Sequence, residues 1–141
     1  MLLVGLPGSG KSTYVERLGA TALSSDEMRR LLTDDPTNQN IHRRVFRVLR
    51  TLLKHRIELG RAVSYIDATN LTERERRPYI KLADLHDCDI EAVFFDVPLQ
   101  ECQRRNRDRG RVVPDEAIAE MAARLSPPRV EEGFSRVIVV R

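Results

Sequence analysis

The sequence predicts an α/β fold, in which a five-stranded parallel sheet is covered by helices on both faces. Short apolar runs of strand length alternate with segments of helical spacing along the whole chain. The first apolar run leads directly into a glycine-rich loop, and polar motifs follow the later strands. Ligands bind at such strand ends in parallel sheets. The length of 141 residues fits a single domain covering residues 1–141.

The predicted strands are short and apolar. They cover residues 2–4, 22–24, 62–68, 90–97 and 137–140. Glycine and proline separate them from the helices, since Gly19 and Gly60 end helices whereas Pro98 and Pro114 begin them. Right-handed crossovers are expected between the parallel strands.

The predicted helices carry apolar residues three or four positions apart. They cover residues 11–18, 26–32, 41–59, 72–86, 98–107 and 114–125. A polar break at 33–40 separates the second helix from the third. Pro78 is expected either to kink helix 72–86 or to mark its true start. Helix 41–59 has an arginine-rich face, which is either a solvated surface or a contact for nucleic acid.

A phosphate-binding loop lies between the first strand and the first helix. Residues 5–12 match G-x-x-x-x-G-K-S/T at every fixed position. The glycines let backbone N–H groups converge on a phosphate, and the helix N-terminus adds the positive end of its dipole. Lys11 is expected to reach the β- and γ-phosphates of ATP, and Ser12 to bind Mg²⁺. The other predicted nucleotide-binding residues are Gly8, Ser9, Gly10 and the adjacent helix residue Thr13.

Asp26 and Arg29 follow the second strand. A kinase needs a carboxylate that accepts the proton of the acceptor hydroxyl, and Asp26 is placed to supply it. Arg29 is three residues later on the same helix face, where it can hold a negatively charged part of the acceptor. The alternative is that Asp26 only caps a helix and that Arg29 is a surface cation.

The third strand ends in Asp67-Ala68-Thr69-Asn70. Asp67 is predicted to hold a Mg²⁺-bound water, which makes Ser12 and Asp67 the predicted metal site. Thr69 and Asn70 are predicted to contact the substrate, or alternatively to cap the next helix.

Five arginines fall within residues 104–111 and form a predicted Arg-rich lid. Arg105 and Arg109 share a helix face if the helix persists, so the pair can clamp a phosphoryl group in the transition state. Gly110 is the predicted hinge. The alternative is a solvated basic turn, although clustered arginines repel one another unless an anion neutralises them.

Together these motifs resemble the polynucleotide 5′-kinase family, the P-loop kinase domains of phage and bacterial end-healing enzymes. The resemblance covers nearly the whole chain and rests on residues 5–13, 24–29, 67–70, 96–98 and 105–109. The Asp-x-x-Arg and Arg-Asn-x-x-Arg segments, in this order and spacing, are its most selective parts. The chain departs from the pattern at Ala68, where some phage relatives place an acid.

The resemblance implies a P-loop kinase that uses ATP and Mg²⁺ to phosphorylate the 5′-OH ends of DNA or RNA during repair. It implies that Asp26 is the general base and that Arg29 grips the phosphate next to the terminal nucleoside. It also implies that a clamp on the transferring phosphoryl group is formed by Lys11, Arg105 and Arg109.

Further implications concern partners. Val113, just before Pro114, resembles the apolar residue that meets the terminal base of the nucleic acid. Family members often carry phosphatase, ligase or hydrolase modules, so fused or partner repair modules are expected. Two alternatives stay open: a P-loop kinase of a small metabolite, sugar or antibiotic hydroxyl, and a non-catalytic nucleotide-binding module.

Composition limits the remaining function classes. No apolar run approaches the ~20 residues of a membrane span, and no signal peptide is visible. Cys88 and Cys102 lack metal-ligand spacing, so a reduced, cytoplasmic location is expected. The net charge of +3 does not by itself argue for nucleic acid, but 21 of the 24 basic residues are arginine, which suits phosphate contacts.

Overall fold

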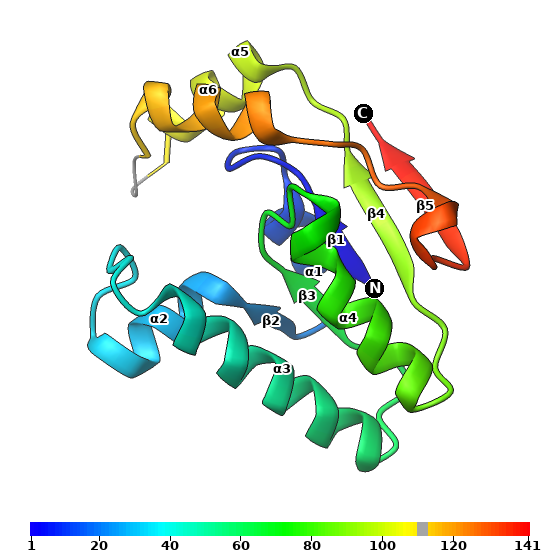
Figure 1. Cartoon of the computed structure of the whole chain (residues 1–141). Coiled ribbons are helices and arrows are strands. Elements are labelled where there is room, and N and C mark those ends of the chain that lie inside the picture. The colour runs from blue at the N-terminus through cyan, green and yellow to red at the C-terminus, as the bar shows by residue number, and fades with distance from the viewer. Residues whose placement is uncertain (110–112) are drawn as a thin grey trace.

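The computed structural model describes residues 1–109 and 113–141, and within them five parallel strands form one sheet. The strands are β1 (Leu2–Val4), β2 (Ala22–Ser24), β3 (Tyr65–Asp67), β4 (Glu91–Phe95) and β5 (Arg136–Val140). Their order across the sheet is β2-β3-β1-β4-β5, with every neighbouring pair parallel, so β1 lies at the centre (Figure 1). The predicted α/β fold is therefore confirmed.

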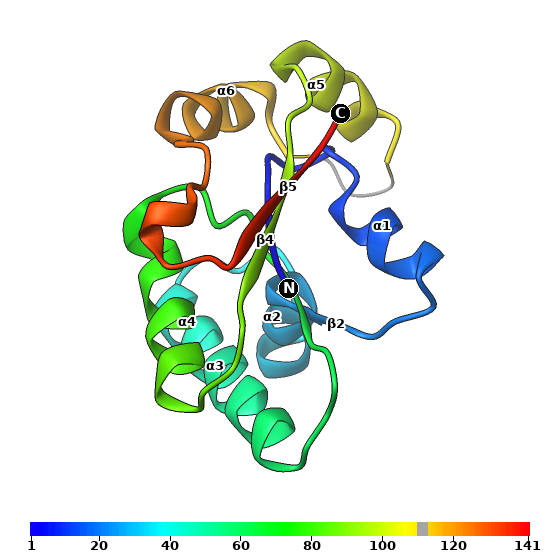
Figure 2. The ribbon, with the colours of Figure 1, turned by 90° about the vertical axis from the view of Figure 1, so that its right-hand side faces the viewer.

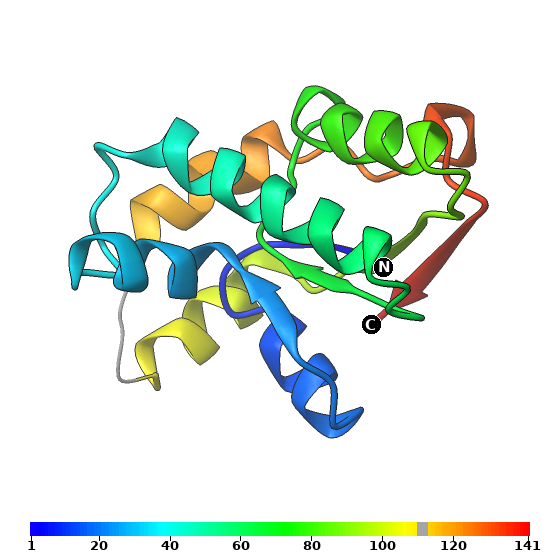
Figure 3. The ribbon, with the colours of Figure 1, turned by 90° about the horizontal axis from the view of Figure 1, so that it is seen from below.

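Helices cover both faces of the sheet, as predicted. They are α1 (Lys11–Arg17), α2 (Ser25–Thr33), α3 (His42–Glu58), α4 (Glu73–Leu85), α5 (Leu99–Arg107), α6 (Asp115–Arg124) and the short 3₁₀ helix η1 (Val130–Glu132). Figures 2 and 3 show α3 and α4 on one side of the sheet and α1 on the other. Helices α5 and α6 lie beyond the carboxyl ends of β1 and β4, at the top of Figure 1.

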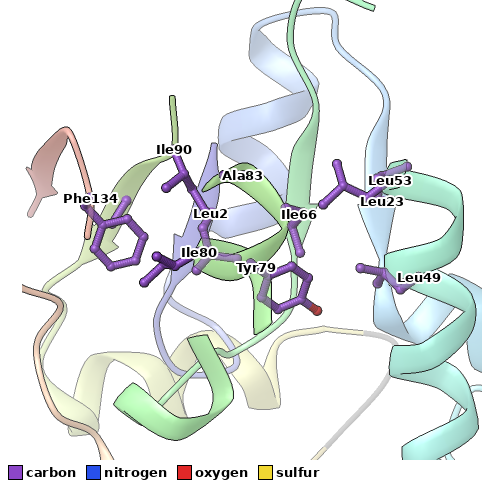
Figure 4. Packing of buried hydrophobic residues seen from close by; sticks show 11 residues of the cluster. Leu2, Leu23, Leu49, Leu53, Ile66, Tyr79, Ile80, Ala83, Ile90 and Phe134 are labelled. Carbon is purple, nitrogen blue, oxygen red and sulfur yellow. The ribbon is translucent and has the colours of Figure 1, made fainter. Parts of the chain in front are cut away.

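The two faces of the sheet have separate cores, because successive strand residues point to opposite sides. Leu2 of β1 packs with residues of α3 and α4, such as Leu49 and Tyr79 (Figure 4). Leu3, one position later, packs with Val15 of α1. A third apolar cluster joins α5 and α6 to the loops that follow β1 and β3; it consists of Leu6, Leu71, Cys102 and Ile118. This third cluster holds α5 and α6 over the strand ends.

The third strand is shorter than the predicted 62–68. The backbone carbonyl of Ser64 accepts a hydrogen bond from the N-terminal amino group of Met1, at 2.9 Å. Arg56 of α3 donates to the Ser64 hydroxyl and to the Val63 carbonyl. These contacts satisfy the polar groups of residues 63–64 outside the sheet ladder, so β3 begins only at Tyr65.

The expectation that Pro78 marks the start of a helix is wrong. Helix α4 begins at Glu73, and the Thr72 hydroxyl caps it by accepting a hydrogen bond from the Glu75 backbone N–H. Pro78 therefore lies inside the helix. Helix η1 carried no periodic signal and was not predicted. None of the described helices combines the length and the apolarity that crossing a membrane requires.

Candidate active site

All fourteen predicted site residues line one cavity of about 2060 Å³. They come from the loop before α1, the start of α2, the end of β3, helix α5 with the residues after it, and the segment before α6. They are Gly8, Ser9, Gly10, Lys11, Ser12, Thr13, Asp26, Arg29, Asp67, Thr69, Asn70, Arg105, Arg109 and Val113. The predicted hinge Gly110 lies outside the described residues.

The phosphate-binding loop has the backbone that its glycines predict. Gly8 and Gly10 have φ angles of +82° and +101°, a region that residues with a Cβ rarely adopt, and Gly10 directly precedes α1. A Cβ on Gly8 would lie 2.5 Å from the Cys102 carbonyl oxygen of α5. Helix α5 therefore packs directly on the phosphate-binding loop.

Lys11 is a buried lysine whose ammonium points into this loop. Only 8% of the residue is exposed, and Nζ donates to the carbonyl oxygens of Gly5 and Leu6 at 3.0 and 2.8 Å. Burial lowers the pKa of Lys11 to about 8, an effect that the Asp67 carboxylate opposes and that the Arg109 guanidinium reinforces. An incoming phosphate would replace two neutral carbonyls with a formal negative charge.

Ser12 and Asp67 form a close hydroxyl–carboxylate pair. The Ser12 hydroxyl donates to Asp67 Oδ2 at 2.6 Å, which joins the start of α1 to the end of β3. Both side chains offer hard oxygen ligands beside the phosphate-binding loop. This donor set fits Mg²⁺, which commonly takes one or two protein oxygens and completes its shell with phosphates and water.

Asp26 and Arg29 face the same cavity from the first turn of α2. An Arg29 guanidinium nitrogen lies 3.2 Å from Asp26 Oδ1. The helix is capped by Ser24, whose hydroxyl accepts from the Glu27 backbone N–H, so the reading of Asp26 as a helix cap is wrong. Arg29 is only 5% exposed, so the reading as a surface cation is also wrong.

The buried position of Arg29 depends on α3. A second guanidinium nitrogen lies 3.1 Å from His42 Nδ1, and the Phe46 ring centroid is 6.0 Å from the guanidinium carbon. Burial and the nearby Arg29 charge lower the pKa of His42, so its Nδ1 accepts the hydrogen bond from Arg29. No local sequence pattern indicates this partner, because His42 is thirteen residues away and meets Arg29 only through the packing of α2 on α3.

The segment after β3 is fixed by its own hydrogen bonds. The buried Asn70 side chain donates to the carbonyls of Leu3 and Ala68, and the Thr69 carbonyl accepts from the Gly5 backbone N–H. Since Thr72 caps α4, the expectation that Thr69 or Asn70 caps it is wrong. The substrate contact of these two residues stays a prediction.

Carboxylates of the chain itself neutralise part of the predicted lid. Glu101 receives hydrogen bonds from Arg104 and Arg105, which lower its pKa to about 2, and Arg107 lies 3.7 Å from Asp115. The expectation that these clustered arginines need an external anion is therefore not met for Arg104, Arg105 and Arg107, which already have carboxylate partners. Among the lid arginines within residues 1–109, only Arg109 has no carboxylate within 4.0 Å.

Asn106 is a positioning residue that the sequence argument did not single out. It is fully buried; its side-chain nitrogen donates to the Val113 carbonyl at 2.5 Å, and its oxygen accepts from the Val113 backbone N–H at 3.1 Å. The two bonds tie α5 to the segment before α6. The only signal was its place between Arg105 and Arg109 in the quoted motif.

The assembled cavity can serve two reactants at once. One wall, formed by the loop before α1, presents backbone N–H groups and Lys11 to an anion. Another part of the lining presents the half-exposed Asp26 carboxylate and the Arg29 guanidinium. The Arg109 guanidinium lowers the pKa of Lys11, whereas the Asp26 carboxylate raises it. This arrangement suits transfer of a charged group from a bound anion to a neighbouring hydroxyl.

Comparison with known proteins adds family relationships. A family model described as an AAA domain, AAA_33, matches residues 1–128. The transcription factor bHLH140 of Arabidopsis thaliana is 31% identical over 146 residues, which cover 98% of this chain and 15% of that protein. The L-seryl-tRNA(Sec) kinase of Methanococcus maripaludis is 25% identical over 135 residues, which cover 91% of this chain and 52% of that protein. The chain thus spans about half, or less, of these relatives.

Solved structures share the fold. A chain of the Pnkp1/Rnl/Hen1 RNA repair complex superposes with a TM-score of 0.74 at 25% identity, covering 88% of this chain and 42% of that one. A gluconokinase from Sinorhizobium meliloti 1021 superposes with a TM-score of 0.62 at 19% identity, covering 99% and 79%. The predicted P-loop kinase fold and the predicted resemblance to the polynucleotide 5′-kinase family are confirmed.

Proposed function

The chain belongs to the AAA domain family AAA_33, as a P-loop kinase domain, and we propose that it transfers the γ-phosphate of ATP to the 5′-OH ends of DNA or RNA. The observation that carries this proposal is the position of Asp26 and Arg29. They line the same cavity as Lys11. Among the described residues, Asp26 is the only carboxylate that closely follows a strand end and is paired with a buried arginine.

The proposed reaction uses the side chains in distinct roles. The ATP phosphates occupy the loop before α1, and Mg²⁺ near Ser12 and Asp67 would neutralise part of their charge. The Asp26 carboxylate takes the proton of the acceptor 5′-hydroxyl while that oxygen bonds to the γ-phosphorus. The bond from the γ-phosphorus to the β,γ-bridging oxygen breaks, and its electron pair leaves with ADP.

Three cations are proposed to stabilise the charge that develops on the transferring group. Lys11 points into the phosphate-binding loop, and a guanidinium nitrogen of Arg105 lies 3.8 Å from where a Cβ on Gly10 would be. Arg105 would exchange its contact with Glu101 for the phosphate. Arg109 has no carboxylate to exchange within the described part of the chain. Fixed cations of this kind lower the barrier of phosphoryl transfer.

Two similar proteins support a nucleic-acid acceptor. One is a chain of an RNA repair complex and the other is an L-seryl-tRNA(Sec) kinase. By analogy we propose that the domain works with other nucleic-acid repair modules, on the same chain or as partners, in the cytoplasm. Val113, Thr69 and Asn70 are proposed to contact the terminal nucleoside.

The proposal is tested by measuring transfer of the labelled γ-phosphate of ATP, with Mg²⁺, to a panel of acceptors. A DNA and an RNA oligonucleotide with a 5′-OH should be labelled, whereas the same strands with a 5′-phosphate should not. Labelling of gluconate or another small hydroxyl compound without labelling of oligonucleotides would identify a metabolite kinase instead. ATP binding without labelling of any acceptor would indicate a non-catalytic module.

A further inference from the structure

A row of arginines on α3 lines the active-site cavity together with Asp26 and Arg29, the residues proposed to meet the acceptor. Arg43, Arg47 and Arg50 are spaced four and three residues apart, so they lie on one helix face, and all three line the active-site cavity. The row begins next to His42, the partner of Arg29. Within residues 1–109 and 113–141, no carboxylate lies within 4.0 Å of these three guanidinium groups. Their charge is therefore available to a ligand.

A second, shallower cavity of about 410 Å³ extends the same row. It shares Arg47 and Arg50 with the first cavity and adds Lys54 of α3 and Lys81 of α4. None of its described lining residues is acidic; the nearest carboxylate to Lys54 belongs to Glu58, at 3.8 Å. We call the surface formed by Arg43, Arg47, Arg50, Lys54 and Lys81 the α3–α4 groove. Figures 1 and 3 show the two helices running side by side there.

Tyr79 of α4 places an unpaired donor between the same two helices. The residue is 2% exposed and its hydroxyl has no hydrogen-bond partner, yet it is among the residues that line the active-site cavity. Figure 4 shows its ring between Ile80 and Leu49. Burial raises the pKa of Tyr79, so the hydroxyl stays protonated and can donate. A buried donor left unpaired is unfavourable, and an acceptor oxygen on a ligand would satisfy it.

The acidic side chain that α4 contributes to the active-site cavity, Glu75, is already engaged. Glu75 accepts hydrogen bonds from the Leu71 backbone N–H at 2.8 Å and from Arg124 at 2.6 Å. A solvated helix face explains single cations on α3. It does not explain why α4 contributes a facing lysine and an unpaired buried donor to the same surface.

The length of the groove matches a polymer. From Arg43 to Lys54 the axis of α3 advances roughly 16 Å at ~1.5 Å per residue. Stacked nucleotides advance ~3.4 Å each, so the groove spans about five of them. A single small hydroxyl compound would leave most of it empty.

We propose that the α3–α4 groove binds the phosphodiester backbone of the acceptor strand beyond its terminal nucleotide. Arg29 holds the first phosphate, and Arg43, Arg47, Arg50, Lys54 and Lys81 hold the following ones. This inference rests on the proposed function and narrows it, because it requires a single-stranded end several nucleotides long to lie in the groove.

The test compares acceptors of increasing length, from a nucleoside 3′-phosphate to a single strand of about ten nucleotides, all with a 5′-OH. In the wild-type protein, kcat/KM should rise with length and level off near about five nucleotides. In the Arg47→Ala/Arg50→Ala variant, the ratio of kcat/KM for the long strand to that for the nucleoside 3′-phosphate should fall by ~10–100-fold. The slope of log Kd against log salt should also decrease by about 1.4, at ~0.7 per lost single-strand contact.

Arg44→Ala/Arg61→Ala is the matched control. It removes the same charge from exposed positions that line neither cavity, and it should keep the length preference. Tyr79→Phe separates weaker binding from loss of folding, because it removes only the unpaired hydroxyl. It should unfold no more easily than the wild-type protein and should still bind the long strand more weakly.

The outcomes separate the inference from the function it rests on. Labelling of a nucleoside 3′-phosphate and a long strand with equal kcat/KM would leave the 5′-kinase intact and overturn the groove. If no acceptor is labelled, the proposed function is wrong, and the groove is judged by the binding of a 5′-phosphorylated strand. Equal binding by the wild-type protein and Arg47→Ala/Arg50→Ala would then overturn it as well.

Discussion

Lys11 carries a charge that the fold disfavours until a phosphate arrives. Its pKa is about 8 in the folded protein, against an ordinary value of 10.5, because the side chain is buried. Between these two pH values the unfolded chain binds more protons than the folded one, so the contribution of Lys11 to the free energy of unfolding rises with pH across that window. Below pH 8 the penalty is fully present and amounts to roughly 3 kcal/mol at most.

Replacement of Lys11 should therefore stabilise the nucleotide-free protein while abolishing catalysis. We expect Lys11→Met to raise the free energy of unfolding at pH 7 by about 1–3 kcal/mol, measured by urea denaturation, and the gain to shrink above pH 8. Transfer activity should fall by ~10³-fold or more. A variant that is less stable than the wild-type protein at pH 7 would contradict the assigned cost of burying this lysine.

Arg29 is expected to act on the acceptor rather than on ATP. Arg29→Ala should lower kcat/KM by ~10–100-fold for acceptors with a phosphate next to the terminal nucleoside, because a charge-assisted hydrogen bond is lost. A bare nucleoside should be affected much less. Steady-state kinetics with the two acceptors measure the difference, and Arg30→Ala is the control, since Arg30 is exposed and pairs with Glu27. An equal loss with both acceptors would remove Arg29 from this role.

The helices and strands were predictable because their signals are contiguous. The apolar run 2–4, the glycine-rich loop and Lys11 follow one another directly, and the structure has β1, the loop and α1 there. The boundary of β3 was not predictable, since it depends on contacts from Met1 and Arg56. The hydrogen bonds between Asn106 and Val113 also escaped the sequence, because they cross a segment with no periodic pattern.

The junction of α5 and α6 should depend on the Asn106 amide. Asn106→Ala leaves the Val113 backbone N–H and carbonyl without their partner, which should lower the free energy of unfolding by about 1–3 kcal/mol. It should also reduce kcat, because Arg105 and Arg109 flank the same residue. Asn106→Asp would place a carboxylate oxygen against the Val113 carbonyl at a fully buried site, so it should destabilise the protein at least as much as Asn106→Ala. Denaturation and transfer rates of the three proteins test this order, and equal values for all three would exclude a positioning role.

Over the whole molecule, a buried ion pair ties the active-site loop to the distant η1 helix. Arg76 and Glu132 have side chains that are 0% and 2% exposed, and two guanidinium nitrogens donate to the carboxylate at 2.8 and 3.0 Å. Arg76 also donates to the carbonyls of Asn70 and Leu71, next to the cavity. No sequence pattern joins residues 56 positions apart, so both the pair and the convergence of the site could be found only from the tertiary structure.

Breaking this pair should destabilise the fold strongly. Glu132→Gln leaves the Arg76 charge buried without a counterion and should cost about 3–5 kcal/mol of unfolding free energy. Glu91→Gln breaks the exposed pair with Arg136, whose nitrogen–oxygen distance is 2.9 Å, and should cost about 0–1 kcal/mol. Urea denaturation of the two variants measures the contrast. Similar losses would mean that burial of the Arg76–Glu132 pair does not increase its contribution to the free energy of unfolding.

The convergence of Asp26 with the cations of the phosphate-binding loop and lid is tested most directly by the rate of a single turnover. Asp26→Asn removes the proton acceptor without changing the shape of the side chain, and Glu27→Gln makes the same change one residue later, on an exposed carboxylate. With saturating ATP and a 5′-OH strand, Asp26→Asn should slow phosphoryl transfer by ~10²–10⁴-fold while its Kd for ATP stays unchanged. Glu27→Gln should react like the wild-type protein. An Asp26→Asn protein that transfers phosphate within about tenfold of the wild-type rate would contradict the account.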